Sequence, residues 1–263
     1  AGLLGAGAGM LAPWLSGILI TRMADSKGYT LIFSISLAVF LVGVLVSLFL
    51  KKRKVDGRYE WLHNIYRLRD QQSPWRRISP GLMMQGIREG VFIFVIGLLV
   101  YISTGNEMQL GNYALITSGV SLIAFYLAGK WLKPFRRNAA MLIGAVLITA
   151  VILPFFWKVN YTTLLIFGVG VSLFFPLYSI PMTSSVFDYI GRDEDSAAHR
   201  VEYVVLREES LNLGRMLGTL LFIAVVSLSK EPMVLNSFLL IIGSTPILSW
   251  MFMRTILKRY KHS

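Results

Sequence analysis

The chain has 263 residues, of which 55% are apolar and 15% are charged, and its mean hydropathy is +0.61. Soluble domains carry about 25% charged residues, so too few polar side chains are present to cover a soluble domain of this size. This composition excludes intrinsic disorder and collagen, and the absence of cysteine excludes a disulfide framework. It indicates an integral membrane protein.

Eight stretches are long and apolar enough to cross a bilayer, which takes about 20 residues of helix. They are residues 2–21, 30–50, 81–104, 109–132, 139–157, 161–185, 204–228 and 233–256. They are too long and too uniformly apolar for transmembrane strands, and only a helix pairs all its backbone groups within one segment. The predicted fold class is therefore all-α, a polytopic membrane protein.

The basic residues predict the orientation, because they accumulate in cytoplasmic loops. With residues 51–80 placed inside, twenty of the 26 Lys and Arg fall on the cytoplasmic side and four on the other, while Arg88 and Arg215 fall within spans. We expect a bacterial inner-membrane protein whose linker and C-terminus are cytoplasmic. The net charge of +12 then reflects topology and attraction to anionic lipids, and it does not indicate nucleic-acid binding.

The longest polar stretch, residues 51–80, separates residues 1–50 from residues 81–263. It opens with KKRK, and Pro74 and Pro80 are expected to close it before the next span. Four apolar residues recur in it at helical spacing: Trp61, Leu62, Ile65 and Leu68. This spacing favours an amphipathic helix on the inner leaflet, with a disordered basic linker as the alternative. Because the chain begins with Ala inside a span, we expect a further N-terminal part.

Two helices, a basic linker and six helices resemble helices five to twelve of the major facilitator superfamily. The stretch GIREGVFIFVIGLLVYISTGNEMQLGNYALITSGVSLIAFYLAGKWLKPFRRN, together with SVFDYIGRDEDS and VEYVVLREESLNLGRMLG, is similar to the YqgE-like transporter subgroup of Bacillus-type bacteria. The resemblance implies two six-helix halves, each a pair of inverted three-helix repeats. Residues 1–50 would end the first half, and residues 81–263 would form the second.

The resemblance further implies a secondary active transporter that works by alternating access around a site at mid-membrane. We expect it to be a monomer that moves a small solute of unidentified kind, with H+ as the coupling ion and efflux slightly favoured over uptake. A sodium-coupled sugar-type symporter is the first alternative. A membrane-embedded enzyme or scaffold is the second, and it would need an acid–base or metal cluster at one interface.

Small residues follow one face of the first span: Gly5, Gly9, Pro13 and Gly17. Such a stripe lets a neighbouring backbone approach closely. The resemblance adds that helix five of proton-coupled drug antiporters carries a motif around GPxxGG. Pro13 and Gly17 match this motif, but Ala12 and Ser16 depart from it. Helix packing and an antiporter-type motif therefore both remain open.

A second motif follows the fourth span, from Gly129 to Arg137. The superfamily often has a GxLaDRxGRR-like loop here that gates the cytoplasmic side through a charge relay. Gly129 and Arg137 fit this loop and Arg136 adds charge, but its acidic position is Lys133. Plain inside-facing topology charges are the alternative reading.

Ionisable residues within spans are the main functional candidates, because a charge in hydrocarbon is costly unless it faces a cavity or a partner. The third span has Gln85, Arg88 and Glu89. Gln85 and Glu89 share a face, and Arg88 points about 100° away, since helical residues advance by that angle. The seventh span carries a polar stripe of Glu208, Asn212, Arg215 and Thr219. A transport or gating role competes with snorkelling to the inner interface.

The sixth span contains Pro176 and Pro181, which would free carbonyls at mid-membrane and break the helix. Tyr178, Ser179, Thr183 and Ser184 could then bond these carbonyls or a solute, as in transporters with broken helices. A kink needed only for packing is the alternative. Asp188 is expected to pair with Arg215 or Arg88 and latch the inner gate. Weaker candidates lie in the fourth span: Asn112, Thr117, Ser118 and Ser121.

Several chemistries have no motif in this sequence. His63, His199 and His262 lie in predicted cytoplasmic segments, and neither HExxH nor a phosphate-binding GxxxxGK[ST] loop occurs. We therefore expect no enzymatic activity, no metal and no cofactor.

Overall fold

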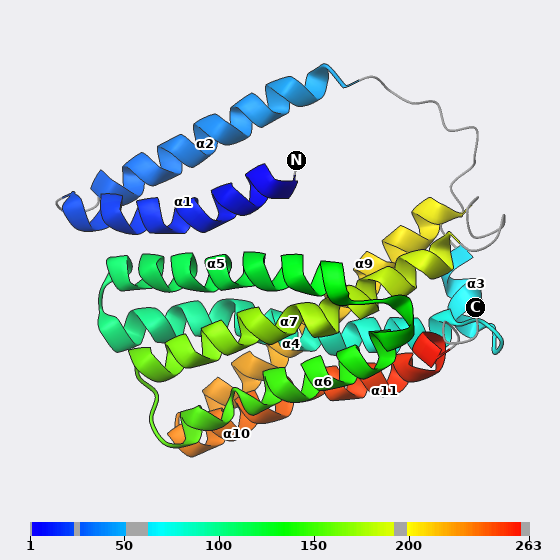
Figure 1. Cartoon of the computed structure of the whole chain (residues 1–263). Helices are drawn as coiled ribbons and strands as arrows, with labels where there is room; N and C mark the ends of the chain where they lie inside the picture. Colours follow the sequence, from blue (N-terminus) through cyan, green and yellow to red (C-terminus); the bar gives the residue numbers. More distant parts are fainter. Residues whose placement is uncertain (1, 24–26, 51–62, 192–198, 259–263) are drawn as a thin grey trace.

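The computed structural model describes residues 2–23, 27–50, 63–191 and 199–258, with side-chain surroundings described from residue 9 and, after the first linker, from residue 66. Every regular element in these ranges is helical, which confirms the all-α fold. The elements are α1 (Gly2–Arg22), α2 (Lys27–Leu48), α3 (His63–Arg69), α4 (Trp75–Thr104), α5 (Glu107–Trp131), η1 (Pro134–Arg136), α6 (Arg137–Ala150), η2 (Leu153–Phe156), α7 (Tyr161–Ile190), α9 (Arg200–Leu228), α10 (Pro232–Gly243) and α11 (Thr245–Lys258). Figure 1 shows them in space.

Seven helical segments in the described residues are long and apolar enough to cross a membrane, which is compatible with an integral membrane protein. They match seven of the eight expected stretches, with Pro134–Phe156 and Pro232–Lys258 each counted as one. The remaining stretch, residues 2–21, is α1, a helix of 21 residues. The helix α9 begins at Arg200, four residues before the expected span of residues 204–228.

The linker differs from expectation at its end. The helix α4 begins at Trp75, so Pro80 lies inside it and does not close the linker. A proline is tolerated there because the carbonyl that it leaves free, that of Arg76, belongs to an exposed residue in the first turn, within reach of water. The short helix α3 forms part of the expected amphipathic segment, with Leu68 packed on the core. Trp61 and Leu62 lie outside the described residues, as does the side chain of Ile65.

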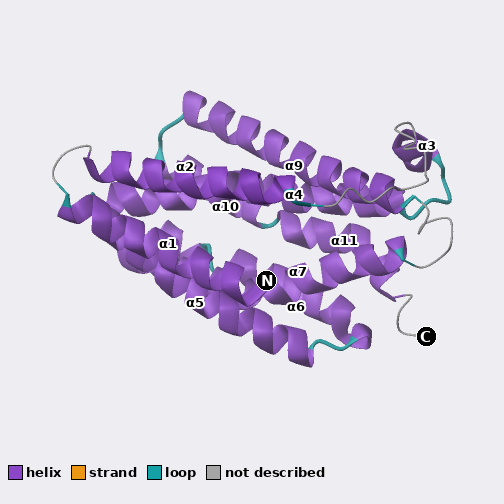
Figure 2. Cartoon of the chain, turned by 90° about the horizontal axis from the view of Figure 1, so that it is seen from above, coloured by secondary structure: helices purple, strands orange, loops and turns teal. Residues whose placement is uncertain are grey.

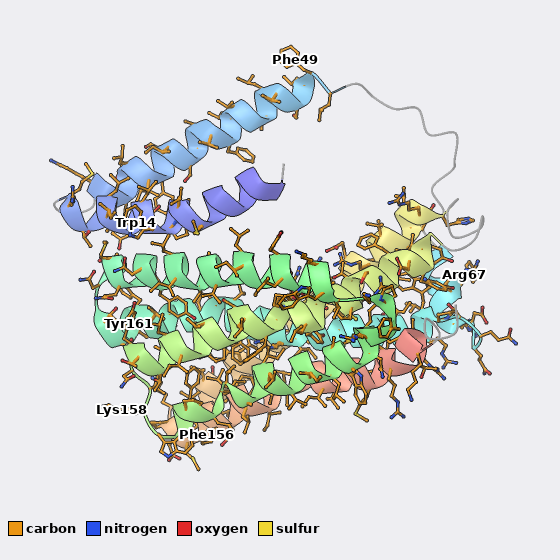
Figure 3. All side chains as sticks on the ribbon, in the orientation of Figure 1. Trp14, Phe49, Arg67, Phe156, Lys158 and Tyr161 are labelled. Atoms are coloured by element: carbon orange, nitrogen blue, oxygen red, sulfur yellow. The ribbon has the colours of Figure 1, made fainter. Side chains whose placement is uncertain are left out.

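The helices from α4 onward form two triples, one of α4, α5 and α6, the other of α7, α9 and the pair α10–α11. The main helix contacts of the two triples correspond to each other. The helix α4 packs on α9 as α7 packs on α5, and α4 packs on α11 as α7 packs on α6. The triples also run in opposite directions, because α4 begins at the Arg67 end of the bundle and α7 at the Tyr161 end (Figure 3). This is the arrangement of two inverted three-helix repeats.

The first two helices lie on the outside of this bundle. The helix α1 packs along α5, and α2 packs on α1, as Figures 1 and 2 show. The most apolar window of α2 has no buried residue. Phe33 is 71% exposed and Leu48 is 75% exposed, and Phe49 points away from the molecule (Figure 3). Such a large apolar surface is suited to hydrocarbon or to a further protein segment, and not to water.

The six-helix unit has two buried apolar clusters, one toward each end. At the α3 end Trp75 stacks on Tyr203, with ring centroids 5.3 Å apart. Toward the other end Phe167 packs between Phe92 and Phe155. On α4 the first cluster ends at Leu82 and the second begins at Ile87. Residues 85–89 therefore lie where the two clusters meet.

The expectation of a helix broken at Pro176 and Pro181 is wrong, because α7 runs uninterrupted from Tyr161 to Ile190. Both prolines are buried within it. A proline within a helix removes one backbone hydrogen bond and crowds the carbonyl four residues earlier, and α7 packs closely on α6 in this region. An added Cβ at Gly144 of α6 would lie 2.7 Å from the Tyr178 nitrogen, so the two backbones nearly touch.

The interruptions occur instead in the third member of each triple. The helix α6 ends at Ala150, ahead of η2, and α10 ends at Gly243, ahead of α11. Pro246 explains the second break, since its ring clashes with the helical carbonyl four residues earlier. Threonines take up the freed carbonyls. Thr245 donates to the Ile242 oxygen at 2.8 Å, and Thr149 donates to the Gly243 oxygen at 3.0 Å.

Candidate functional site

The helices α4 and α9 cross with their backbones in contact. Gly86 and Gly90 of α4 face Gly214 and Gly218 of α9, each pair spaced by four residues. A Cβ added at Gly86 would overlap the Leu211 carbonyl oxygen, and one added at Gly90 would lie 2.8 Å from the Arg215 Cα. Small residues at this spacing allow such an approach. Both GxxxG patterns are visible in the sequence, and neither is among the candidate motifs given above.

An ion-pair cluster spans this crossing. Glu89 of α4 accepts two hydrogen bonds at Oε2 from Arg215 of α9, from Nη2 at 2.8 Å and from Nε at 3.1 Å. Its Oε1 accepts from Nε2 of Gln85 at 2.7 Å. On the other side, Arg215 donates from Nη1 to Oδ1 of Asn212 at 2.9 Å. Four of the candidate residues thus form one network, and both Glu89 oxygens are bonded.

The remaining members of the α9 stripe are used differently. Thr219 donates to the Arg215 carbonyl of its own helix at 2.9 Å and to the Gly90 carbonyl at 3.3 Å, so it ties the crossing together. Glu208 forms an ion pair with its neighbour Arg207 and does not join the network. Ser79 and Ser210 add a buried hydrogen bond of 2.7 Å between α4 and α9, which no sequence pattern indicated.

Arg88 points to the other side of α4, as its position on the helix predicts. Its side chain is 6% exposed, and the guanidinium lies 4.9 Å from the centroid of the Phe92 ring. Its Nε and Nη2 are buried and have no hydrogen-bond partner in the part of the chain that the structure describes. Arg88 lines a cavity of about 190 Å³ between α4, α5 and α7.

A second cavity, of about 280 Å³, lies between α5 and α7 near the α3 end. Ser179, Thr183 and Ser184 line it together with Phe125. On α7, Ser172 of the first cavity precedes Ser179 and Thr183 by 7 and 11 residues, so the three share one helix face. Of the four polar candidates in α5, Thr117 lines the Arg88 cavity, whereas Asn112, Ser118 and Ser121 are half-buried and line neither cavity.

The expected pairing of Asp188 with Arg215 or Arg88 is wrong. Asp188 pairs with Arg137, at 2.5 Å between Oδ2 and Nη1. The reason is the packing of α6 along α7, which brings the first residue of α6 beside the end of α7, whereas Arg88 and Arg215 lie deeper in the bundle. The loop motif has Lys133 at its acidic position, but its Arg137 has a carboxylate partner in Asp188 of α7. Tyr178 donates to Ser249 of α11 at 2.9 Å, a buried link between helices.

The stripe on α1 serves helix packing at two positions. An added Cβ at Gly17 would lie 2.8 Å from the Glu107 carbonyl oxygen, and one at Gly111 would lie 3.1 Å from the Pro13 oxygen. No described atom lies within 4 Å of such a Cβ at Gly9, and the surroundings of Gly5 lie outside the described residues. Tyr29 of α2 extends this contact by donating to Glu107 at 2.8 Å.

Replacing Gly17 with leucine should therefore push α1 off α5. We expect the midpoint of thermal unfolding to fall by several degrees, since overpacking costs about 1–3 kcal/mol. The matched control is Gly9→Leu on the same helix, which should unfold within about 1 °C of the wild type. Equal effects of the two substitutions would contradict the α1–α5 contact.

The described residues hold no group of three or more His, Asp or Glu that could bind a metal ion.

Among known proteins, the chain is similar to the "Uncharacterized protein YqgE" of Bacillus subtilis (strain 168), with 36% identity over 255 residues. The match covers 97% of this chain and 59% of that protein. No family model and no solved structure matches the chain. The fold itself therefore defines the class, an all-helical protein with helices that fit a membrane. The chain spans somewhat more than half the length of the relative that it matches.

Proposed function

We propose that the protein is a secondary active transporter of the major facilitator type, in which the helices described here act as helices five to twelve. The observation that carries the proposal is the charged layer between α4 and α9. Glu89, Arg215 and the buried Arg88 lie in the interior of long apolar helices, where charges usually mark a solute or ion pathway. A protein that needed only to anchor itself in a membrane would gain nothing from them.

The architecture supports the same proposal. Two inverted triples of helices, with charged and polar groups between them, are the design of many secondary transporters. The two-helix unit meets the six-helix unit along α1 and α5, so the halves can rock against each other about one helix pair. The polar face of α7, from Ser172 to Thr183, provides a path from the Arg88 cavity toward the α3 end. The basic residues in the loops at that end support placing it in the cytoplasm.

We propose that Glu89 couples transport to the proton gradient. In the state described here its carboxylate bridges Gln85 and Arg215, and protonation would remove the charge that holds Arg215. Loosening this bridge changes the contact between the two triples. Since a ligand shifts a conformational equilibrium only by its unequal affinity for the two states, a proton bound to Glu89 in only one state would drive the change. The Arg137–Asp188 pair would latch the cytoplasmic end.

The test uses the intact protein in proteoliposomes. A pH gradient is imposed across the vesicle membrane, and the buffers contain no Na+. Addition of small solutes, one class at a time, should produce a solute-dependent proton flux with at least one class. Flux that requires Na+ at fixed pH would favour the sodium-coupled alternative. Protein that is folded and inserted but moves no solute under either gradient would contradict the proposal.

A further inference from the structure

Arg88 carries a buried charge without a counterion in the described residues. The side chain is 6% exposed, and no ion pair or hydrogen bond joins it to another described residue. The neighbouring carboxylate is not available, because Glu89 is held by Arg215 and Gln85 through both of its oxygens. Two arginines and one glutamate thus leave a single positive charge in this layer of the bundle. A guanidinium cannot lose its charge by deprotonation, so this site favours an anion.

The free donors have a specific arrangement. Nε and Nη2 are the two unpartnered atoms, and their N–H bonds point to the same side along one edge of the planar guanidinium. That edge offers two parallel hydrogen bonds, which match the two oxygens of a carboxylate. A halide or another single-point anion would leave one of these donors unused.

The cavity beside Arg88 has apolar walls and a polar border. The rings of Phe92 and Phe167 lie 5.6 Å apart, nearly parallel, and both residues are buried. Tyr113 and Ser172 are half-buried at the border of the cavity, and their hydroxyls make no hydrogen bond with a described residue. Gly168 makes room for this arrangement, because a Cβ there would overlap the Tyr113 hydroxyl. A volume of about 190 Å³ suits a small organic molecule.

We propose that this cavity binds a small organic acid, with its carboxylate on the Nε and Nη2 edge of Arg88 and its apolar body against the side chains of Phe92 and Phe167 that line the cavity. The inference rests on the proposed function and names the class of solute that the transporter would carry. Binding of the acid neutralises the charged layer, and a neutral layer is easier to carry through the conformational change in a low-dielectric interior. Arg88 is then the group that distinguishes an acid from its neutral amide.

The experiment uses the intact protein in nanodiscs and three probes measured by calorimetric titration: benzoate, its neutral isostere benzamide, and acetate, which has no apolar body. We expect benzoate to bind, benzamide to bind at least about 30-fold more weakly, and acetate to bind more weakly than benzoate, since loss of one buried charged partner typically changes affinity by this much or more. Arg88→Gln should lower the affinity for benzoate by a similar factor. Arg88→Lys, which keeps the charge but not the paired donors, should recover part of it.

Arg76→Gln is the matched control, because Arg76 lies on the same helix but is exposed at the α3 end, and it should bind benzoate as the wild type does. Benzoate affinity that is equal in wild type and Arg88→Gln would overturn the proposal, as would equal affinity for benzoate and benzamide or no binding of benzoate. Parallel uptake in proteoliposomes separates the two proposals. Benzoate that binds through Arg88 without being moved would contradict the transporter and leave the acid site in place. Uptake of solutes that is equal in wild type and Arg88→Gln would support the transporter and contradict the acid site.

Discussion

Replacing Gly214 with valine should strongly destabilise the protein. A side chain at this position would meet the Met83 carbonyl oxygen and the Gly86 Cα, both of which are backbone atoms that cannot turn aside. The helices α4 and α9 would have to separate, and the Glu89–Arg215 bond across their contact would stretch. We expect a loss of at least about 3 kcal/mol, measured as a fall of about 6 °C or more in the midpoint of thermal unfolding.

The matched control for this substitution is Gly97→Val in α4, the helix that carries Gly86. No described atom lies within 4 Å of an added Cβ at Gly97, so we expect its unfolding midpoint to stay within about 1–2 °C of the wild type. If Gly214→Val and Gly97→Val unfold alike, the two helices do not cross as closely as the structure shows.

Replacing Glu89 with glutamine should uncouple transport from the proton gradient. The amide keeps the size of the carboxylate but carries no charge and does not titrate in the physiological range, so neither the ion pair to Arg215 nor a proton cycle remains. We expect proton-driven accumulation to fall by about 100-fold, which corresponds to a loss of about 2.7 kcal/mol of coupling. Exchange of solute for solute, which needs no proton, should continue. Uptake with and without an imposed gradient measures both quantities.

Glu208→Gln is the control for this second prediction. Glu208 also lies on α9, but it pairs with Arg207 outside the network, so accumulation should remain within about twofold of the wild type, the scale of a surface ion pair. Proton-driven accumulation that survives in Glu89→Gln would remove Glu89 from the coupling step, whatever the state of Arg215.

Much of the fold and part of the site follow from periodicity alone. Apolar runs of span length predict the long helices, and the spacing of Asn212, Arg215 and Thr219 places them on one face of α9. The spacing of Gln85 and Glu89 likewise predicts their contact, which has a length of 2.7 Å. These relations lie within one helix, where sequence distance sets spatial distance.

Relations between helices were harder to predict, because they depend on which faces pack together. Asp188 was assigned to the wrong arginine, since nothing in the order of residues says that the end of α7 lies beside the start of α6. The prolines predict a break in α7, but the helix continues through them where it packs against Gly144. The glycines of α4 and α9 carried a readable signal, and two GxxxG patterns could have indicated that these helices meet.

Alternating access is the central claim, and the labelling of one residue tests it most directly. The chain has no cysteine, so Ser172→Cys places a single thiol at the Arg88 cavity, at mid-helix in α7. A membrane-impermeant thiol reagent is applied to right-side-out and to inverted vesicles, with Lys158→Cys and Lys130→Cys as markers of the two faces. We predict that the Ser172→Cys thiol reacts from both sides, while each marker reacts from one. Reaction of the Ser172→Cys thiol from a single side under all conditions would contradict alternating access.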